Sequence, residues 1–248
     1  MSAAPPVLNV SAYLFTPVTD AVQLRPALRA RAVAAGLKGT IILAEEGINL
    51  FLAGPDAALR GYLDDLRADP RFARLRATES WSAAQPFRKM LVKLKREIIR
   101  MDRPAVRPDE GRAPAVTPAT LRRWLDQGHD DAGREVVLLD TRNAFEVDEG
   151  AFDGALDWRL ERFTQFPDAV AVHRDELRGK TVVSYCTGGI RCEKAAIVLR
   201  EEGVDAWQLD GGILAWFAAE GQAHYRGDCF VFDERWAVDS ALAPAAVR

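Results

Sequence analysis

Hydrophobic and polar positions alternate regularly along the first part of the chain. Extended stretches rich in apolar residues alternate with two segments whose apolar residues recur at helical spacing. A Glu45-Glu46-Gly47 turn splits one extended stretch into a hairpin. The order strand, helix, paired strands, helix and further strand predicts a ferredoxin-like (βαββαβ) α+β domain over residues 1–102. In chain order the segments are 7–18, 20–36, 39–54, 55–72, 75–80 and 90–99.

A different pattern follows in the second part of the chain. Residues 135–140, 181–186 and 206–209 are continuous apolar runs, which are typical of parallel strands buried on both faces. Helical patterns lie between them, most clearly over residues 192–203. This alternation predicts an α/β domain with a parallel sheet over residues 118–226, and such domains carry their sites at the carboxyl ends of strands.

Prolines mark the boundary between the two patterns. Proline at this density stiffens a chain and excludes helix interior, so residues 103–117 are predicted to be a linker. The next helix should begin with Thr117 as its N-cap and Pro118 as its first residue. Residues 227–248 then form a C-terminal extension. The prolines of this region are Pro104, Pro108, Pro114 and Pro118.

Composition narrows the class of protein. A chain of 248 residues with 48% hydrophobic residues can bury a full core. No apolar run approaches the roughly 18 residues that span a bilayer, and no export signal is visible. Three cysteines are too few for a disulfide framework in a chain of this length. We therefore expect a cytoplasmic protein with no membrane partner, and the absence of G-x-G-x-x-G indicates no nucleotide cofactor.

Cys186 ends a predicted strand and is followed by a turn into a helix. The two glycines of that turn permit backbone angles that aim successive N–H groups at the sulfur, forming an anion nest. The helix dipole and a full charge on the loop arginine should lower the pKa of the thiol and make it nucleophilic. A buried, inert cysteine would need neither feature. The loop residues are Thr187, Gly188, Gly189, Ile190 and Arg191.

Two further groups of residues have a chemical and a plain structural interpretation. Cys192 could resolve an oxidised Cys186 as a disulfide, or simply pack against the sheet. His173 and Asp175 with His224 match the H-x-D…H spacing of an iron site, but their loop context argues against a metal, and we expect none.

A basic segment is the only independent sign of nucleic acid. Residues 87–107 hold eight basic residues against two acidic ones in a chain of net charge −3. On the predicted strand Lys93 and Lys95 share one face, whereas Val92 and Leu94 should face the core. Such a stripe either binds RNA phosphates or is a solvated surface. The candidate RNA-binding residues are Arg88, Lys89, Lys93, Lys95 and Arg96.

Two resemblances sharpen these predictions. YCTGGIRCEKAA (185–196) resembles the active-site loop of rhodanese-like domains. With four residues between Cys186 and Arg191, the loop has a size that suits a single sulfur or a small anion. Four separated segments together resemble the bacterial tRNA uridine hydroxylases, and four motifs in order are far more specific than one. The segments are GTIILAEEGIN (39–49), DTRNAFEVDEGAF (140–152), YCTGGIRCEKAA (185–196) and GDCFVFDER (227–235).

The resemblance implies a function and roles for residues. It implies oxygen-dependent hydroxylation of the wobble uridine (position 34) of tRNA to 5-hydroxyuridine, with Cys186 catalytic. Molecular oxygen is then the co-substrate, the tRNA anticodon loop is the partner, and no other cofactor is evident. Asp140 and Arg142 match the rhodanese segment with a buried acid and arginine, and are expected to form an ion pair that supports the loop. A rhodanese-type sulfurtransferase carrying a persulfide on Cys186 is the alternative, and a non-enzymatic RNA-binding protein stands behind both.

Overall fold

The computed structural model describes residues 6–245, which form two compact units. The first unit contains the chain up to Ile99 together with Phe232–Trp236, and the second contains Arg100–Val231 and the chain from Ala237 onward. The chain therefore passes from one unit to the other at three points. Each unit has its own sheet and its own hydrophobic core.

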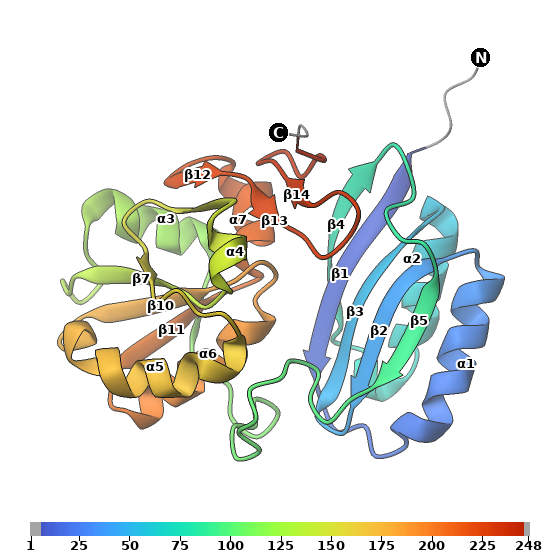
Figure 1. The fold of residues 1–248 in the computed structure, drawn as a ribbon, viewed down its shortest axis with the longest axis horizontal. Helices are drawn as coiled ribbons and strands as arrows, with labels where there is room; N and C mark the ends of the chain where they lie inside the picture. Colours follow the sequence, from blue (N-terminus) through green and yellow to red (C-terminus); the bar gives the residue numbers. More distant parts are fainter. Residues whose placement is uncertain (1–5, 246–248) are drawn as a thin grey trace. The chain divides into compact units, whose positions relative to one another are not determined.

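The first unit is a helix-backed sheet with strand order β4-β1-β3-β2-β5. The order of its first four strands confirms the ferredoxin-like prediction, and β5 is an added strand parallel to β2. Both helices lie on one face of the sheet (Figure 1). Its elements are β1 (Val7–Phe15), α1 (Ala21–Ala34), β2 (Lys38–Ala44), β3 (Gly47–Gly54), α2 (Asp56–Arg67), a 3-10 turn (Pro70–Phe72), β4 (Arg76–Ser82) and β5 (Met90–Leu94).

The alternation along β1 explains this arrangement. Leu8, Val10 and Ala12 are buried and face the helices, because successive side chains of a strand point to opposite sides. The other face of the same sheet receives the returning segment 232–236. There the Phe232 ring lies 6.5 Å from the Phe51 ring on β3, and Arg235 donates to the Ser80 hydroxyl on β4 at 2.8 Å.

The second unit has an entirely parallel five-stranded sheet with the order β6-β11-β10-β7-β9. Helices α3 and α7 cover one face, and α5 and α6 the other (Figure 1). This confirms the parallel-sheet α/β prediction. Its elements are β6 (Ala115–Val116), α3 (Pro118–Gln127), β7 (Val136–Asp140), α4 (Ala144–Val147), β8 (Gly150–Phe152), β9 (Leu156–Asp157), α5 (Phe166–His173), β10 (Thr181–Tyr185), α6 (Ile190–Glu201), β11 (Asp205–Leu209), α7 (Gly212–Glu220), β12 (Tyr225–Gly227), β13 (Cys229–Phe230) and β14 (Ala237–Val238), with 3-10 turns at Phe163–Gln165 and Arg174–Leu177.

The proline-rich segment is docked on the second unit rather than being a free spacer. Its β6 pairs with β11, and Arg112 donates to the buried carboxylate of Glu193 at 2.8 Å. Thr117 caps α3 by accepting from the Thr120 N–H, with Pro118 in the first turn, as predicted. The segment expected as the linker thus supplies a strand and an ion pair, which proline content alone does not reveal.

The expected C-terminal extension is likewise shared between the units. β12 pairs with β8, and β13 pairs with β14, inside the second unit. Residues 232–236 belong to the first unit instead. The boundaries expected at residues 102 and 226 therefore differ from the divisions found in the structure.

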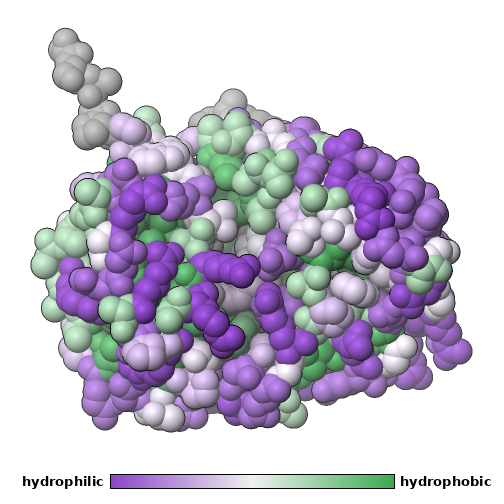
Figure 2. Space-filling model, turned by 180° about the vertical axis from the view of Figure 1, so that it is seen from behind, coloured by the Kyte–Doolittle hydropathy of each residue, from purple (hydrophilic) through white to green (hydrophobic). Residues whose placement is uncertain are grey.

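Hydrophilic and hydrophobic side chains are interspersed over the face shown in Figure 2. Within residues 6–245 no helix combines the length and the apolar character that crossing a membrane requires.

Candidate active site

Cys186 lies at the carboxyl edge of the parallel sheet, directly after β10. Tyr185, the last residue of β10, is paired in register with Asp140, the last residue of β7. The predicted strand ends therefore do meet at one edge. Helix α6 begins at Ile190, two residues earlier than predicted, so Arg191 and Cys192 are in its first turn.

Two glycines make the tight loop feasible. Gly189 has a φ of 94°, a left-handed conformation that favours glycine, and its N–H donates to the Cys186 sulfur at 3.1 Å. Gly212, which opens α7, lies so close that a Cβ there would be 2.3 Å from the Cys186 carbonyl oxygen. The next N–H along, that of Ile213, donates to this carbonyl at 2.9 Å. The start of α7 thus fixes the loop backbone at Cys186. The Gly189 N–H is one donor of the predicted anion nest.

Arg191 does not stand free beside the sulfur. Its two terminal nitrogens bind both carboxylate oxygens of Glu146 on α4, at 2.6 and 2.7 Å. Both side chains are buried, and the Asn143 N–H donates to the same carboxylate at 3.1 Å. Arg191 thus carries the full charge that the sequence analysis expected, and it does so as one half of a buried, bidentate ion pair. Sequence analysis missed Glu146, because nothing in the segment 140–152 distinguishes it from other acidic residues.

Asp140 and Arg142 form the buried ion pair that the sequence analysis expected. The Arg142 guanidinium donates to the Asp140 carboxylate at 2.7 Å, and neither side chain is exposed. Arg142 also donates to the carbonyls of Gly150 at 2.7 Å and Glu146 at 3.2 Å. The pair therefore fixes the backbone of α4 and β8. The Arg142 guanidinium also lies 5.9 Å from the centroid of the Tyr185 ring, which belongs to the residue before Cys186.

The charges of these four side chains sum to zero. Asp140 and Glu146 contribute two negative charges, and Arg142 and Arg191 two positive ones. Buried charges of this kind persist only when they are paired and hydrogen-bonded. Peptide dipoles and ion pairs therefore surround Cys186. The four charged side chains leave no net charge beside it.

The Cys186 thiol is nevertheless poised to ionise. Burial by itself would raise the pKa of this thiol. A hydrogen bond from Cys192, the Arg191 charge, and the backbone N–H groups of Arg191 and Gly189 outweigh burial and lower the pKa to about 6. Thiolate is the nucleophilic form of cysteine, so the loop supplies a nucleophile at neutral pH.

The other two cysteines behave differently. Burial raises the pKa of the Cys192 thiol well above its usual range, and its interaction with Cys186 adds to this. Cys192 therefore stays protonated and can donate to the Cys186 sulfur, with the Thr141 hydroxyl 3.9 Å from its own sulfur. Burial also raises the pKa of Cys229, to about 12, in keeping with a packing role. Among the three cysteines, Cys186 is the one that is favoured as a thiolate at neutral pH.

The remaining loop residues and the basic segment are placed as follows. The Thr187 hydroxyl lies 3.5 Å from the carbonyl of Phe230, and Ile190 is buried. The five basic candidates are all exposed, at Arg88, Lys89, Lys93, Lys95 and Arg96. Val92 is buried as expected, whereas Leu94 is 36% exposed and Lys95 lies one residue beyond β5. The prediction of a core position for Leu94 is therefore wrong, because the strand ends there.

No metal centre is assembled by the part of the chain that the structure describes. Within residues 6–245 no group of three or more His, Cys, Asp or Glu side chains could hold an ion. The two histidines of the H-x-D…H spacing have separate partners: His173 lies against Glu176 and His224 against Asp126.

Comparison with known protein families divides the chain in the same two regions. Residues 7–98 match the UPF0176 acylphosphatase-like domain, and residues 117–219 match the rhodanese-like domain. Among solved structures, the rhodanese-like domain of an Anabaena protein is 23% identical, with a TM-score of 0.38, and covers 46% of this chain and 79% of that one.

Curated relatives match nearly the whole chain. A protein of Delftia acidovorans is 64% identical over 97% of this chain and 92% of its own length. One of Variovorax paradoxus is 65% identical over 96% of this chain and 89% of its own. One of Bordetella petrii is 62% identical over 97% and 96%. All three are named tRNA uridine(34) hydroxylase.

Proposed function

The chain belongs to the tRNA uridine(34) hydroxylases, and from this membership we propose that it converts the wobble uridine of tRNA to 5-hydroxyuridine, with Cys186 as nucleophile and molecular oxygen as co-substrate. The observation that carries the role of Cys186 is its lowered thiol pKa in a loop braced by Gly189 and by the Arg191–Glu146 pair. Nucleophilic addition is the chemistry that such a thiolate supports.

The thiolate prepares the pyrimidine for oxygen. Addition of the Cys186 sulfur to C6 of uracil makes C5 enolate-like and therefore electron-rich. Oxygen then adds at C5, one oxygen atom stays as the hydroxyl, and loss of the C5 proton with release of the sulfur restores the ring. The second oxygen atom must leave as water, which requires two electrons and two protons.

Two thiols can supply these two electrons and two protons, and we propose that Cys192 is one of them. Uridine, oxygen and two thiols together give 5-hydroxyuridine, water and one disulfide, with atoms and electrons balanced. The released Cys186 thiolate takes the outer oxygen of the C5 hydroperoxide, which breaks the O–O bond, leaves the C5 hydroxyl and gives a sulfenate on Cys186. The Cys192 thiol then condenses with this sulfenate to a disulfide with loss of water. A cellular thiol would then reduce the disulfide for the next cycle.

The cancelled charges favour this reaction over sulfur transfer from an inorganic donor. Uracil is neutral, whereas thiosulfate carries two negative charges, and burying these costs free energy unless they are paired or hydrogen-bonded. Arg191, the only charged residue of the loop, is already held by Glu146. The geometry therefore supports a neutral substrate at Cys186.

The exposed basic residues of the first unit are proposed to contact tRNA phosphates. Uridine in an anticodon loop can be splayed out of its stack to reach a buried sulfur, and Cys186 is only 1% exposed. Phosphate contacts by Arg88, Lys89, Lys93, Lys95 and Arg96 would make binding weaken steeply with salt.

The deciding experiment analyses nucleosides of tRNA from a strain lacking the gene, grown with or without air. The strain is complemented with the wild-type chain, Cys186→Ser or Cys192→Ser. We expect 5-hydroxyuridine to return only with the wild-type chain in air, to be absent with Cys186→Ser, and to fall with Cys192→Ser. Unmodified uridine in every case, together with a persulfide on purified Cys186 after thiosulfate treatment, would overturn hydroxylation in favour of sulfur transfer.

A further inference from the structure

Helix α4 carries an exposed aromatic ring next to the residue that holds the catalytic loop. Phe145 is 45% exposed, and its neighbour Glu146 is the buried partner of Arg191. In the described part of the second unit, two large hydrophobic side chains are exposed: Phe145 and Val172, an aliphatic residue on α5. A single exposed hydrophobic side chain is ordinary on a protein surface, so the inference rests on the contacts that join Phe145 to the catalytic loop.

The ring is held rigidly by contacts that lead back to the loop. Phe145 packs edge-to-face on Phe230, with centroids 5.1 Å apart and planes at 87°. The carbonyl of Phe230 lies within reach of the hydroxyl of Thr187, the residue after Cys186. The backbone of α4 is fixed as well, because the Ala144 N–H donates to the Leu160 carbonyl at 2.7 Å.

The contact with Phe230 leaves part of the ring open to solvent, since Phe145 is 45% exposed. Whichever ring contributes its edge, Phe230 covers at most one face of Phe145. A rigid aromatic with an open face is the usual platform for an unstacked base, since every base has a π-face. Phe145 and the loop bearing Cys186 are joined through both Glu146–Arg191 and Phe230–Thr187.

We propose that Phe145 is the stacking platform for the uracil ring that reaches Cys186, a positioning role that rests on the proposed hydroxylation. Stacking on Phe145 replaces the neighbouring bases that uridine loses when it leaves the anticodon loop. Because a π-face binds any base, the platform orients the ring and leaves recognition of uridine to other groups.

Steady-state kinetics on an anticodon stem–loop RNA tests this role. Phe145→Leu keeps an apolar side chain against Phe230 but removes the π-face, and we expect KM to rise roughly 5- to 100-fold, with a smaller fall in kcat. Phe145→Trp should restore KM to near the wild-type value. Val172→Ala is the matched control at an exposed hydrophobic position and should leave both constants unchanged.

A cross-link provides a readout that a purely structural role would not produce. An RNA carrying 5-bromouridine at position 34 is irradiated with the wild-type chain, and the tryptic peptide 143–159 is sequenced by mass spectrometry. We expect the cross-link at Phe145. An unchanged KM in Phe145→Leu, or a cross-link confined to other peptides, would overturn the platform while wild-type turnover leaves the hydroxylase intact. No turnover by the wild-type chain would instead refute the proposed function.

Discussion

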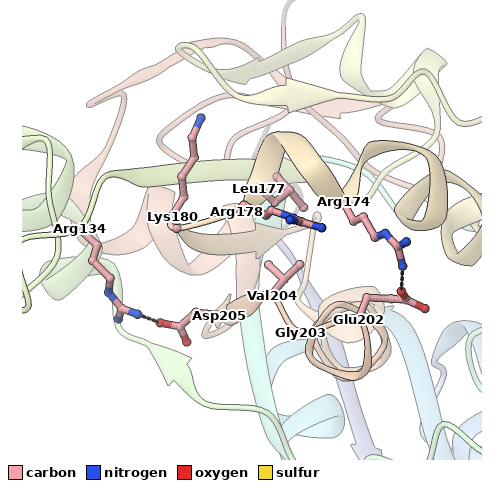
Figure 3. A pocket seen from close by; sticks show the side chains of 10 residues that line it. Arg134, Arg174, Leu177, Arg178, Lys180, Glu202, Gly203, Val204 and Asp205 are labelled. Atoms are coloured by element: carbon pink, nitrogen blue, oxygen red, sulfur yellow. Dashed lines mark hydrogen bonds and ion pairs between the residues drawn. The ribbon is translucent and has the colours of Figure 1, made fainter.

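The two ends of the parallel sheet differ in how far their ion pairs are exposed to water. At the amino ends of β10 and β11 there is a hollow of about 570 Å³ (Figure 3). Arg174 pairs there with Glu202 at 2.9 Å, with side chains 50% and 38% exposed, and Arg134 pairs with the buried carboxylate of Asp130 at 2.8 Å. The charged residues lining it are Arg134, Arg174, Arg178, Lys180, Glu202 and Asp205.

At the carboxyl end the charges are buried. The side chains of Asp140, Arg142 and Glu146 are 0% exposed, and Arg191 joins them in a connected set of ion pairs. Exposed pairs contribute little because water and salt screen them, whereas a buried group depends on its partner. The thiol whose pKa is lowered, that of Cys186, lies at the end of the sheet where the charges are buried.

The largest expected effect on the free energy of unfolding comes from a Glu→Gln substitution in a buried ion pair, compared with the same type of substitution in an exposed pair. Glu146→Gln leaves the buried Arg191 uncompensated and should lower the free energy of unfolding by about 3–5 kcal/mol. The matched Glu202→Gln removes the partner of exposed Arg174 and should cost less than about 1 kcal/mol. Urea unfolding of both variants measures this. Equal losses would remove the contrast between the two ends.

A smaller effect concerns the ionisation of Cys186. Cys192→Ala removes a donor to the thiolate, so the Cys186 pKa should rise above about 6, whereas Cys192→Ser keeps a hydroxyl donor and should raise it less. The ultraviolet absorbance of thiolate, taken relative to Cys186→Ser, gives the titration. Identical midpoints in all three chains would show that Cys192 does not act on the sulfur.

The same shift links Cys186 to stability. Its folded pKa lies below the ordinary value of 9.0, so the thiolate contribution is complete above pH 9 and is lost as pH falls through about 6. The free energy of unfolding should therefore rise more steeply across this window in the wild-type chain than in Cys186→Ser.

The smallest effect is expected at the hollow. Arg174→Ala should change the unfolding free energy by less than about 1 kcal/mol, and the change should shrink as salt is raised. Hydroxylation should be unaffected. A loss of activity in this variant, measured on the same stem–loop RNA, would assign the hollow a part in the reaction.

What the sequence could predict depended on local patterns. The strand order of the first unit, the parallel sheet, the Thr117 cap and the position of Cys186 at a strand end all follow from periodicity and turn residues. The partner of Arg191 could not be predicted, because Glu146 is 45 residues away and is brought close only by the fold. The docking of Arg112 on Glu193 is non-local for the same reason.

The return of Phe232–Trp236 to the first unit has a consequence for biosynthesis. Translation makes the strands of that unit first, yet the Phe232 ring and the Arg235 guanidinium that complete its sheet face come from near the end of the chain. On the ribosome, the strands synthesised earliest therefore wait for a segment that is made after most of the second unit. The open sheet face of the first unit must stay protected from other nascent chains until residue 236 has left the exit tunnel.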